Sequence, residues 1–219
     1  MIDSSFITTI LPQLIEGTIT TLKIAALSTT FGFIGGTILG ALHTLTNKFL
    51  HPLITLYVTL FRGTPMLIQI SCIYLLLPQL GITLSAFTCA VLAISLNSAA
   101  YISQIIKSGI QSIDKGQWQA AHVLGFTKTQ TMRYIILPQA LRVVIPALLN
   151  ESITLIKDSS LASTIGVVEL FKSSSRIISV TYQPIPVYIA MACIYLLITT
   201  LLSIAASYAA RKMHYAYDH

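Results

Sequence analysis

The sequence predicts an all-α polytopic membrane protein with about five transmembrane helices, and three observations support this. The 219 residues are 54% hydrophobic and only 9% charged, and the mean hydropathy is +0.79. Soluble domains carry roughly a quarter charged residues, so this chain has too few charges to cover a water-facing surface. The charges also flank apolar stretches long enough to cross a bilayer, which takes about 20 residues each. We treat residues 1–219 as a single transmembrane domain.

The uncharged stretches and the turn signals between them locate five spans. A break is expected in the second span at Gly63-Thr64-Pro65, and Pro78-Gln79-Leu80-Gly81 reads as the turn before the third. A Ser-rich connector at 159–183, with a partly re-entrant course as one alternative, precedes the last span. The predicted spans are Leu14 to Leu45, Pro52 to Leu77, Leu84 to Ile106, Ala140 to Asp158 and Pro186 to Ala210.

Three glycines in the first span recur at a spacing of four. Gly32, Gly36 and Gly40 fall on one helix face, an arrangement that lets a second helix approach closely. The alternative is the ordinary glycine content of a membrane helix.

The basic residues indicate how the chain is oriented. With five spans, most of them fall on one side, and the positive-inside rule places that side in the cytoplasm. The N-terminus is then outside and the C-terminus inside. The cytoplasmic set is Lys48, Lys107, Lys115, Lys128, Arg133, Arg142, Arg211 and Lys212, and the outer set is Asp3, Glu16, Asp158, Glu169, Lys172 and Arg176.

The charged segment at about 107–138 carries helix signals of its own. Asp114 and Gln117 suggest a capping box that opens a helix over Lys115 to Leu124, and Gly125 is a natural helix stop. A second capping box, Thr127 to Gln130, opens a helix that we expect to end at Ile136, before Pro138. Trp118, Ala121 and Leu124 share one face of the first helix. That face suits the groove of a soluble partner or, alternatively, lipid headgroups.

The sequence does not contain the residue patterns that several function classes require. Cys72, Cys89 and Cys193 form no C-x-x-C pair, and the five histidines show no metal-ligand spacing, so we expect no metal. There is no basic stripe for nucleic acid. There is also no G-x-x-x-x-G-K-[ST] phosphate loop, so the chain is not expected to be an ATPase or any other enzyme.

Sequence blocks along nearly the whole chain resemble one family. Gln119-Ala120-Ala121, then Gly125, then Ile136-Leu137-Pro138 is similar to the EAA loop of permease subunits of binding-protein-dependent ABC importers. The polar amino acid branch of that family is resembled by further blocks in the expected order: Phe61 to Pro65, Leu96 to Tyr101, Gly116-Gln117, Asn150-Glu151 and Lys157 to Ser163.

This resemblance implies a type I importer permease fold in the bacterial inner membrane. Its partners would be two ATP-binding subunits, a second identical or related permease, and an extracytoplasmic solute-binding protein. The chain would bind no cofactor, and ATP and Mg would be used by the partner ATPase. The cytoplasmic coupling helix would dock on that ATPase through Gln117, Trp118, Gln119, Ala120, Ala121, Leu124 and Gly125. The family usually has Glu at the positions of Gln119 and Gln104, so the ionic part of the docking contact is altered here.

Polar groups within the spans mark the expected path of an amino-acid substrate, because such groups are costly in lipid and tend to face a cavity. Glu151, Thr154 and Asp158 share one face of the fourth span, with Asn150 and Lys157 on a neighbouring line. The other candidates are Arg62, Asn97 and Tyr101. For Arg62, Asn97, Tyr101, Lys157 and Asp158 the alternative is a role in helix packing.

Two further function classes were weighed. A secondary transporter or channel working without an ATPase would need an inverted repeat with paired broken helices, and only the break near Gly63 is present. An intramembrane enzyme would need Ser with His, paired Asp, or His and Glu metal ligands inside the spans; no His lies deep in a span, and His43 is near an end with no acidic neighbour.

Overall fold

The computed structural model describes residues 4–45 and 50–215, and within them every regular element is helical. Asp3 and Lys48, which enter the orientation argument, lie outside these residues, and so do the side chains of Arg211 and Lys212. The elements are α1 (Ser4–Leu45), α2 (Leu50–Gly63), α3 (Met66–Leu76), η1 (Pro78–Leu80), α4 (Ala86–Ser112), α5 (Lys115–Val123), α6 (Lys128–Thr131), η2 (Met132–Ile136), α7 (Leu137–Asp158), η3 (Ser159–Ile165), α8 (Leu170–Thr181) and α9 (Pro184–Tyr215).

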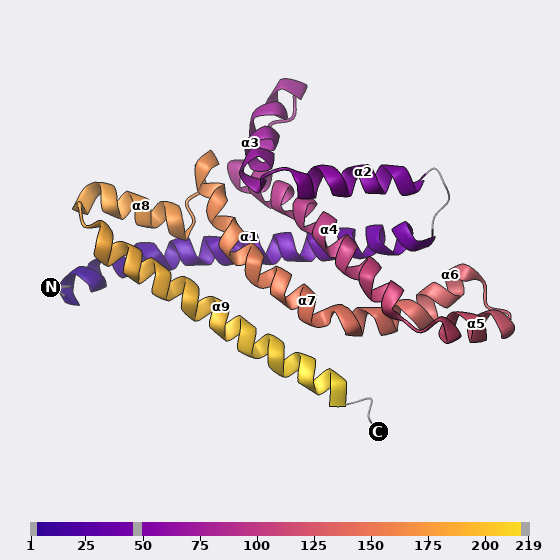
Figure 1. The fold of residues 1–219 in the computed structure, drawn as a ribbon. Coiled ribbons are helices and arrows are strands. Elements are labelled where there is room, and N and C mark those ends of the chain that lie inside the picture. The colour runs from indigo at the N-terminus through magenta and orange to yellow at the C-terminus, as the bar shows by residue number, and fades with distance from the viewer. Residues whose placement is uncertain (1–3, 46–49, 216–219) are drawn as a thin grey trace.

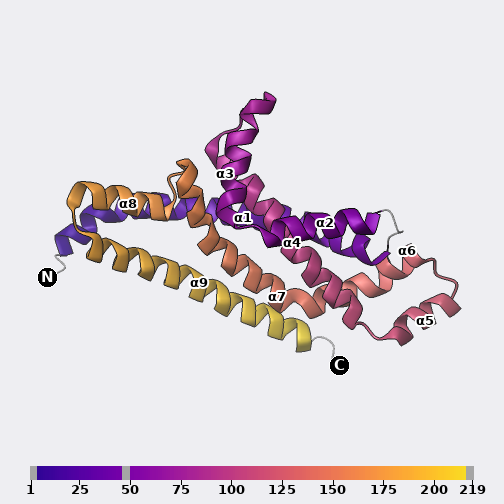
Figure 2. The same ribbon diagram turned by 45° about the horizontal axis from the view of Figure 1, so that its top comes forward.

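The molecule is elongated along α1. Figure 1 shows the N-terminus and α8 at one end, and α5 and α6 at the other. The view in Figure 2 keeps this arrangement and shows α3 projecting from the body. Surface groups on α5 and α8 are therefore far apart.

The helices confirm a protein that crosses the membrane four or five times. Among the residues that the structure describes, four helices are long and apolar enough to span, and α2 with α3 makes a fifth span if the bent pair counts as one. The two helices of this pair meet at 107°, at the break predicted near Gly63. The predicted turn is also present, with Gly81 at φ +78°, a left-handed conformation that favours glycine.

The close approach predicted for the first span is present between α1 and α4. A Cβ built on Gly36 would lie 2.6 Å from the Ile102 side chain, and one on Gly40 would lie 2.7 Å from the Ser103 carbonyl oxygen. A Cβ on Gly32 would lie 2.7 Å from Ser98 Oγ. The three glycines are therefore packing positions at which no side chain fits.

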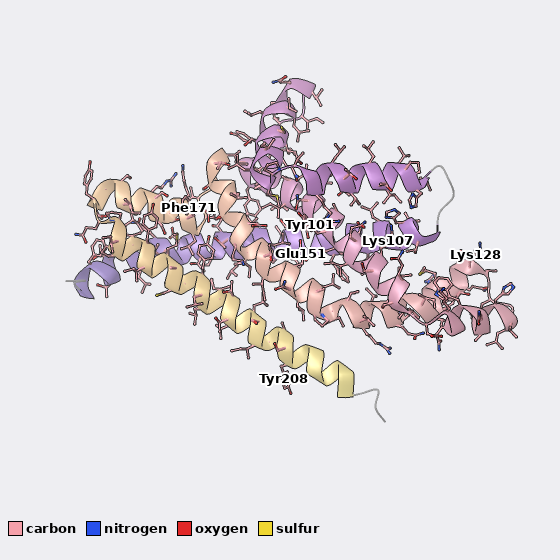
Figure 3. The ribbon with its side chains drawn as sticks, in the orientation of Figure 1. Tyr101, Lys107, Lys128, Glu151, Phe171 and Tyr208 are labelled. Atoms are coloured by element: carbon pink, nitrogen blue, oxygen red, sulfur yellow. The ribbon has the colours of Figure 1, made fainter. Side chains whose placement is uncertain are left out.

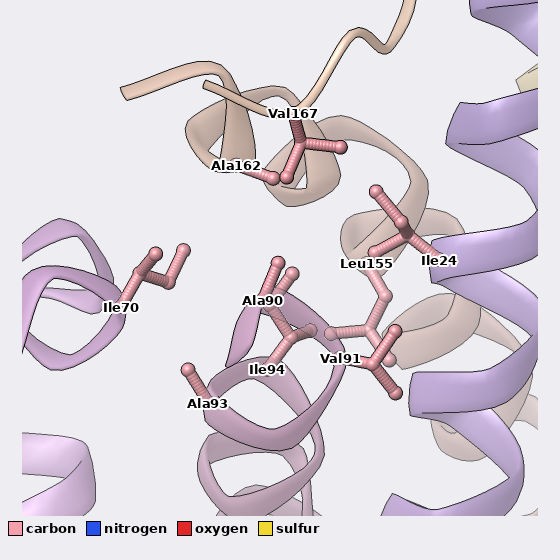
Figure 4. Packing of buried hydrophobic residues seen from close by; sticks show 9 residues of the cluster. All are labelled: Ile24, Ile70, Ala90, Val91, Ala93, Ile94, Leu155, Ala162 and Val167. Atoms are coloured by element: carbon pink, nitrogen blue, oxygen red, sulfur yellow. The ribbon is translucent and has the colours of Figure 1, made fainter. Parts of the chain in front are cut away.

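The largest apolar cluster gathers around the first half of α4. Ile94 and its neighbours Ala90 and Val91 contact Ile24 of α1, Ile70 of α3 and parts of α7 and η3. Figure 4 shows Ile70 and Ile24 on opposite sides of α4. Helix α4 is thus the central element to which the others attach.

The predicted end of a helix before Pro138 is wrong. Helix α6 continues through η2, a π-helical turn, into α7 without a break, and the Leu137 N–H donates to the Met132 carbonyl, five residues back. Proline lacks an N–H and crowds the carbonyl four residues earlier, which normally interrupts a helix. The wider turn just before Pro138 lets the helix continue, so the fourth span is longer than Ala140 to Asp158 and covers residues 128–165.

The connector at 159–183 is more ordered than predicted. It consists of η3 and the amphipathic helix α8, which packs on α1 through Leu170 and Ile177. A Cβ on Gly17 of α1 would lie 2.9 Å from the Leu170 Cα, so the two backbones are in close contact.

Replacing Gly36 by Ala should destabilise the protein, because the new methyl group overlaps Ile102 and forces α1 away from α4. Overpacking of this kind costs about 1–3 kcal/mol, which should appear as a lower Tm of the detergent-solubilised chain. Gly35→Ala is the matched control, since its Cβ meets only the Ala99 Cβ at 3.4 Å. Equal Tm values for the two variants would show that the α1–α4 contact is looser than described.

Candidate functional sites

The break between α2 and α3 is held by a buried pair of amides. Gln69 Nε2 donates to the carbonyl oxygens of Phe61 (2.8 Å) and Thr64 (2.9 Å). From α4, Asn97 Nδ2 donates to the same Phe61 carbonyl and to Gln69 Oε1, both at 2.9 Å. These bonds satisfy carbonyl oxygens that the broken helix leaves without a partner. At membrane depth, a carbonyl left without a hydrogen bond is costly in free energy. Asn97, a predicted pathway residue, is therefore engaged in fixing the break.

Beside the break lies an open cavity of about 470 Å³ between α2, α4 and α7. The guanidinium carbon of Arg62 lies 5.1 Å from the centroid of the Tyr101 ring, a distance at which a cation is attracted to an aromatic face. Gln104, Ser108 and Ser112 of α4 add polar groups to the same wall. The cavity has one cation, Arg62, and no carboxylate among its lining residues.

The polar residues predicted on the fourth span, between Asn150 and Asp158, lie on α7, but they differ in burial and in hydrogen bonding. Glu151 and Asp158 are half-buried, and Figure 3 places Glu151 and Tyr101 both near the middle of the long axis. The Thr154 hydroxyl donates to the Asn150 carbonyl in its own helix at 3.1 Å. The Thr154 hydroxyl therefore has no proton left to donate to a substrate in this conformation.

Asn150 and Lys157 lie outside the Arg62 cavity. Asn150 lines a separate pocket of about 180 Å³ between α7 and α9, together with Ser203 and Ser207. Lys157 is exposed at the end of α7. The structure brings Arg62 and Tyr101 together. Helix α7 lines their cavity through Val143, Val144 and Ala147, and not through the polar residues predicted between Asn150 and Asp158.

The segment between α4 and α7 forms the predicted short helix. Asp114 caps α5, with its carboxylate accepting from the Gly116 N–H at 2.6 Å; the expected partner was the N–H of Gln117. Gly125, at φ +78°, ends the helix. The Gly125 N–H donates to the His122 carbonyl and the Phe126 N–H to the Ala121 carbonyl, which together form a Schellman motif. The second capping box, Thr127 with Gln130, is confirmed.

The face of α5 that was expected to dock, with Trp118, Ala121 and Leu124, is only partly exposed. Ala121 is only 1% exposed, and Trp118 is half-buried against the cluster of α4, η2 and α7 that contains Ile110 and Met132. The apolar face of a helix turns toward whatever apolar surface its own chain offers, so Trp118 and Ala121 fasten the helix to the body. Of the predicted docking residues, Gln117, Gln119, Ala120, Leu124 and Gly125 are exposed, with Leu124 73% and the adjacent Val123 83% exposed.

A buried carboxylate that sequence reasoning assigned to an outer loop is Glu169. It caps α8, accepting from the N–H groups of Phe171 and Lys172 at 2.8 Å. Thr21 of α1 and Tyr195 of α9 donate their hydroxyls to the same carboxylate. Burial raises the pKa of Glu169, and the hydrogen bonds oppose this rise. Acidic residues are favoured near the start of a helix, and in the sequence Glu169 directly precedes the amphipathic run of α8.

Comparison with known proteins covers nearly the whole chain. Residues 32–215 match the family described as "Binding-protein-dependent transport system inner membrane component". The chain is 38% identical over 201 residues to the putative glutamine transport system permease protein GlnP of Rickettsia bellii (strain RML369-C), covering 91% of this chain and 92% of that protein. It is 41% identical over 203 residues to the L-cystine transport system permease protein TcyB of Bacillus subtilis (strain 168), covering 92% and 87%.

Solved structures agree with these relatives. A crystal structure of an amino acid ABC transporter with histidines superposes with a TM-score of 0.89 at 38% identity, covering 97% of this chain and 99% of that one. The MetNI methionine ABC transporter shares the fold, with a TM-score of 0.82 at 22% identity over 96% and 99% of the two chains. The chain therefore belongs to the inner-membrane permease components of binding-protein-dependent ABC transporters.

Proposed function

We propose that this chain forms the translocation pathway of an importer for a polar amino acid and couples that pathway to ATP hydrolysis in a separate subunit. The cavity at the α2–α3 break carries the proposal, because a broken helix beside a cation at membrane depth belongs in a water-filled path. The similarity to GlnP and TcyB, whose names give glutamine and L-cystine as their substrates, supports the amino-acid class. The family description favours this over a transporter that works without an ATPase.

The cavity has the chemistry to receive a carboxylate. The guanidinium of Arg62 is planar and can form two parallel hydrogen bonds to a carboxylate. Since residue 104 is Gln, no acid in the cavity lining neutralises Arg62. The α-carboxylate of an amino acid fits this position, and Glu151 on α7 is the candidate partner for its ammonium group. Asn150, Lys157 and Asp158 remain candidates for other stages of the path.

The proposed docking surface for the ATPase is the exposed face of α5 defined by Gln119, Ala120, Val123 and Leu124. Apolar side chains this exposed at a helix end are uncommon unless a partner covers them. Gln119 stands where the family usually has Glu, so the contact relies on shape and apolar packing more than on charge. A second permease copy or a related chain completes the pore, and a solute-binding protein delivers the substrate outside.

We propose that the α5 end faces the cytoplasm. Lys107, Lys115, Lys128 and Arg133 all belong to this end of the fold, and Figure 3 shows Lys107 and Lys128 there. Arg176 on α8 lies toward the other end. This distribution agrees with the positive-inside rule and supports an orientation with the N-terminus outside.

Arg62→Gln should lower amino-acid uptake by reconstituted transporter about tenfold or more, because a charge-assisted hydrogen bond contributes roughly 1.5–3 kcal/mol. Arg62→Lys should retain part of the activity. Arg176→Gln, the same change at an exposed position of α8, should leave uptake unchanged. Wild-type uptake by Arg62→Gln would remove Arg62 from the pathway.

Leu124→Glu should release the ATPase subunit from the purified complex and lower uptake at least tenfold, since loss of one well-packed interface residue costs about 2 kcal/mol or more. Val180→Glu is the control, because Val180 is 79% exposed on α8 at the opposite end. Pull-down of the ATPase and uptake in vesicles measure the two effects. Full retention of the ATPase by Leu124→Glu would contradict docking at this face.

Lys115→Cys and Lys128→Cys, made in a background with Cys72, Cys89 and Cys193 replaced, should react with an impermeant thiol reagent only in inside-out vesicles. Arg176→Cys should react only in right-side-out vesicles, because it lies on the opposite side of the membrane. Labelling of position 115 from outside would reverse the proposed orientation.

A further inference from the structure

A cluster of hydrogen-bond donors joins α1, α2 and α4 near the end of the molecule that holds α5. His43 of α1 is 6% exposed, and its ring meets that of His51 of α2 with centroids 4.5 Å apart. The His43 Nε2 lies 3.4 Å from the Lys107 Nζ of α4 and 3.3 Å from the Thr55 Oγ1 of α2. Three separate helices therefore contribute to one small polar site.

The contacts within this cluster conflict with one another. The Lys107 ammonium only donates, so its contact needs an Nε2 without a proton. The Thr55 hydroxyl already donates its one proton to the His51 carbonyl at 2.9 Å, so its contact needs an Nε2 that carries a proton. Neutral His43 can satisfy one of these neighbours and not both, and a protonated His43 would sit beside another cation.

The cluster also has more donors than acceptors. Among residues 4–45 and 50–215, no carboxylate pairs with Lys107, and the His51 ring has only its contact with His43. The Nδ1 of His43 is buried without a hydrogen-bond partner. A cation that is half-buried and lacks an anion is an unfavourable arrangement, so the cluster lacks an acceptor.

We propose that Lys107 and His51, beside the buried His43, bind a phosphate group presented by an anionic lipid headgroup or by a soluble phosphate. The phosphate would accept from the Lys107 ammonium and the His51 ring, and would draw Lys107 from His43. The Nε2 of His43 would then be free to donate to Thr55. The conflict among the contacts is removed by one anion.

The surroundings favour the lipid as the source of the phosphate. On α2, Leu50, Leu53 and Leu56 are 48%, 62% and 56% exposed and flank His51, so acyl chains and a headgroup can be bound together. The inference rests on the proposed orientation, in which this end of the fold meets the cytoplasmic leaflet, where lipids are anionic and basic pockets between helices bind headgroups.

The test is lipid retention by the full chain in complex with its partner subunits. The purified complex is incubated with phosphatidylglycerol or, separately, with phosphatidylcholine, and retained lipid is counted by native mass spectrometry. Lys107→Ala should retain about fivefold less phosphatidylglycerol, the ratio expected for one lysine near a membrane surface. His51→Phe removes a hydrogen-bond donor to the phosphate and should also retain less. His51→Phe keeps a ring against His43. The matched control is Lys128→Ala, an exposed lysine at the same end.

Inorganic phosphate separates the two sources. A rise in the Tm of the wild type with millimolar phosphate, absent in Lys107→Ala and His51→Phe, supports the site with a soluble phosphate. Preferential phosphatidylglycerol retention that these variants lose supports it with a lipid. If both variants behave like Lys128→Ala with phosphatidylglycerol and also with inorganic phosphate, the proposal is wrong. The readout needs no transport, so failure of the proposed import function leaves this result interpretable.

Discussion

At Gly32, Gly36 and Gly40, α1 and α4 come so close that the side chain and backbone of one helix fill the space where the other has no Cβ. This contact aligns α4 along the longest helix of the molecule. It also leaves the other faces of α4 free to bind α3, α7 and η3 through Ile94 and its neighbours. In a bilayer there is little hydrophobic drive to bring helices together, so close packing of small residues must supply the association.

With α4 fixed, its polar face determines how the broken span sits. Asn97 reaches the Phe61 carbonyl and Gln69, and Tyr101, one turn further along, lies against Arg62. The break is thus attached to the helix that is itself most firmly packed. Helix α3 leaves the body at this point, as Figure 2 shows, while Arg62 remains at the wall of the cavity. Fixing the break and shaping the cavity are two results of the same face of α4.

Sequence reasoning found the features that depend on local spacing and missed those that depend on which surfaces meet. The Gly32–Gly40 spacing, the break at Gly63, and the caps at Asp114 and Thr127 are readable because each is determined by a few neighbouring residues. The direction in which Trp118 points depends instead on apolar surface supplied by Ile110 and Met132, which the chain brings together only on folding. The continuity through Pro138 depended on a π-helical turn that has no clear sequence signal. The proximity of Arg62 to Tyr101 and the burial of Glu169 are likewise tertiary facts.

The packing of α5 against α4 and α7 suggests how the proposed coupling to ATP hydrolysis could reach the cavity. Trp118 attaches α5 to a cluster that includes Ile106 and Ile110 of α4 and Ala140 and Val144 of α7. Val144 and the nearby Gly109 are also in the wall of the Arg62 cavity. A displacement of α5 by a docked ATPase would therefore act, through this packing, on both helices that bound the cavity. Packed interfaces shift between discrete arrangements more readily than they deform, so such a push would change the relative position of α4 and α7. The inward-facing Trp118, which first looked like a docking residue, is in this mechanism the contact that carries the motion into the membrane.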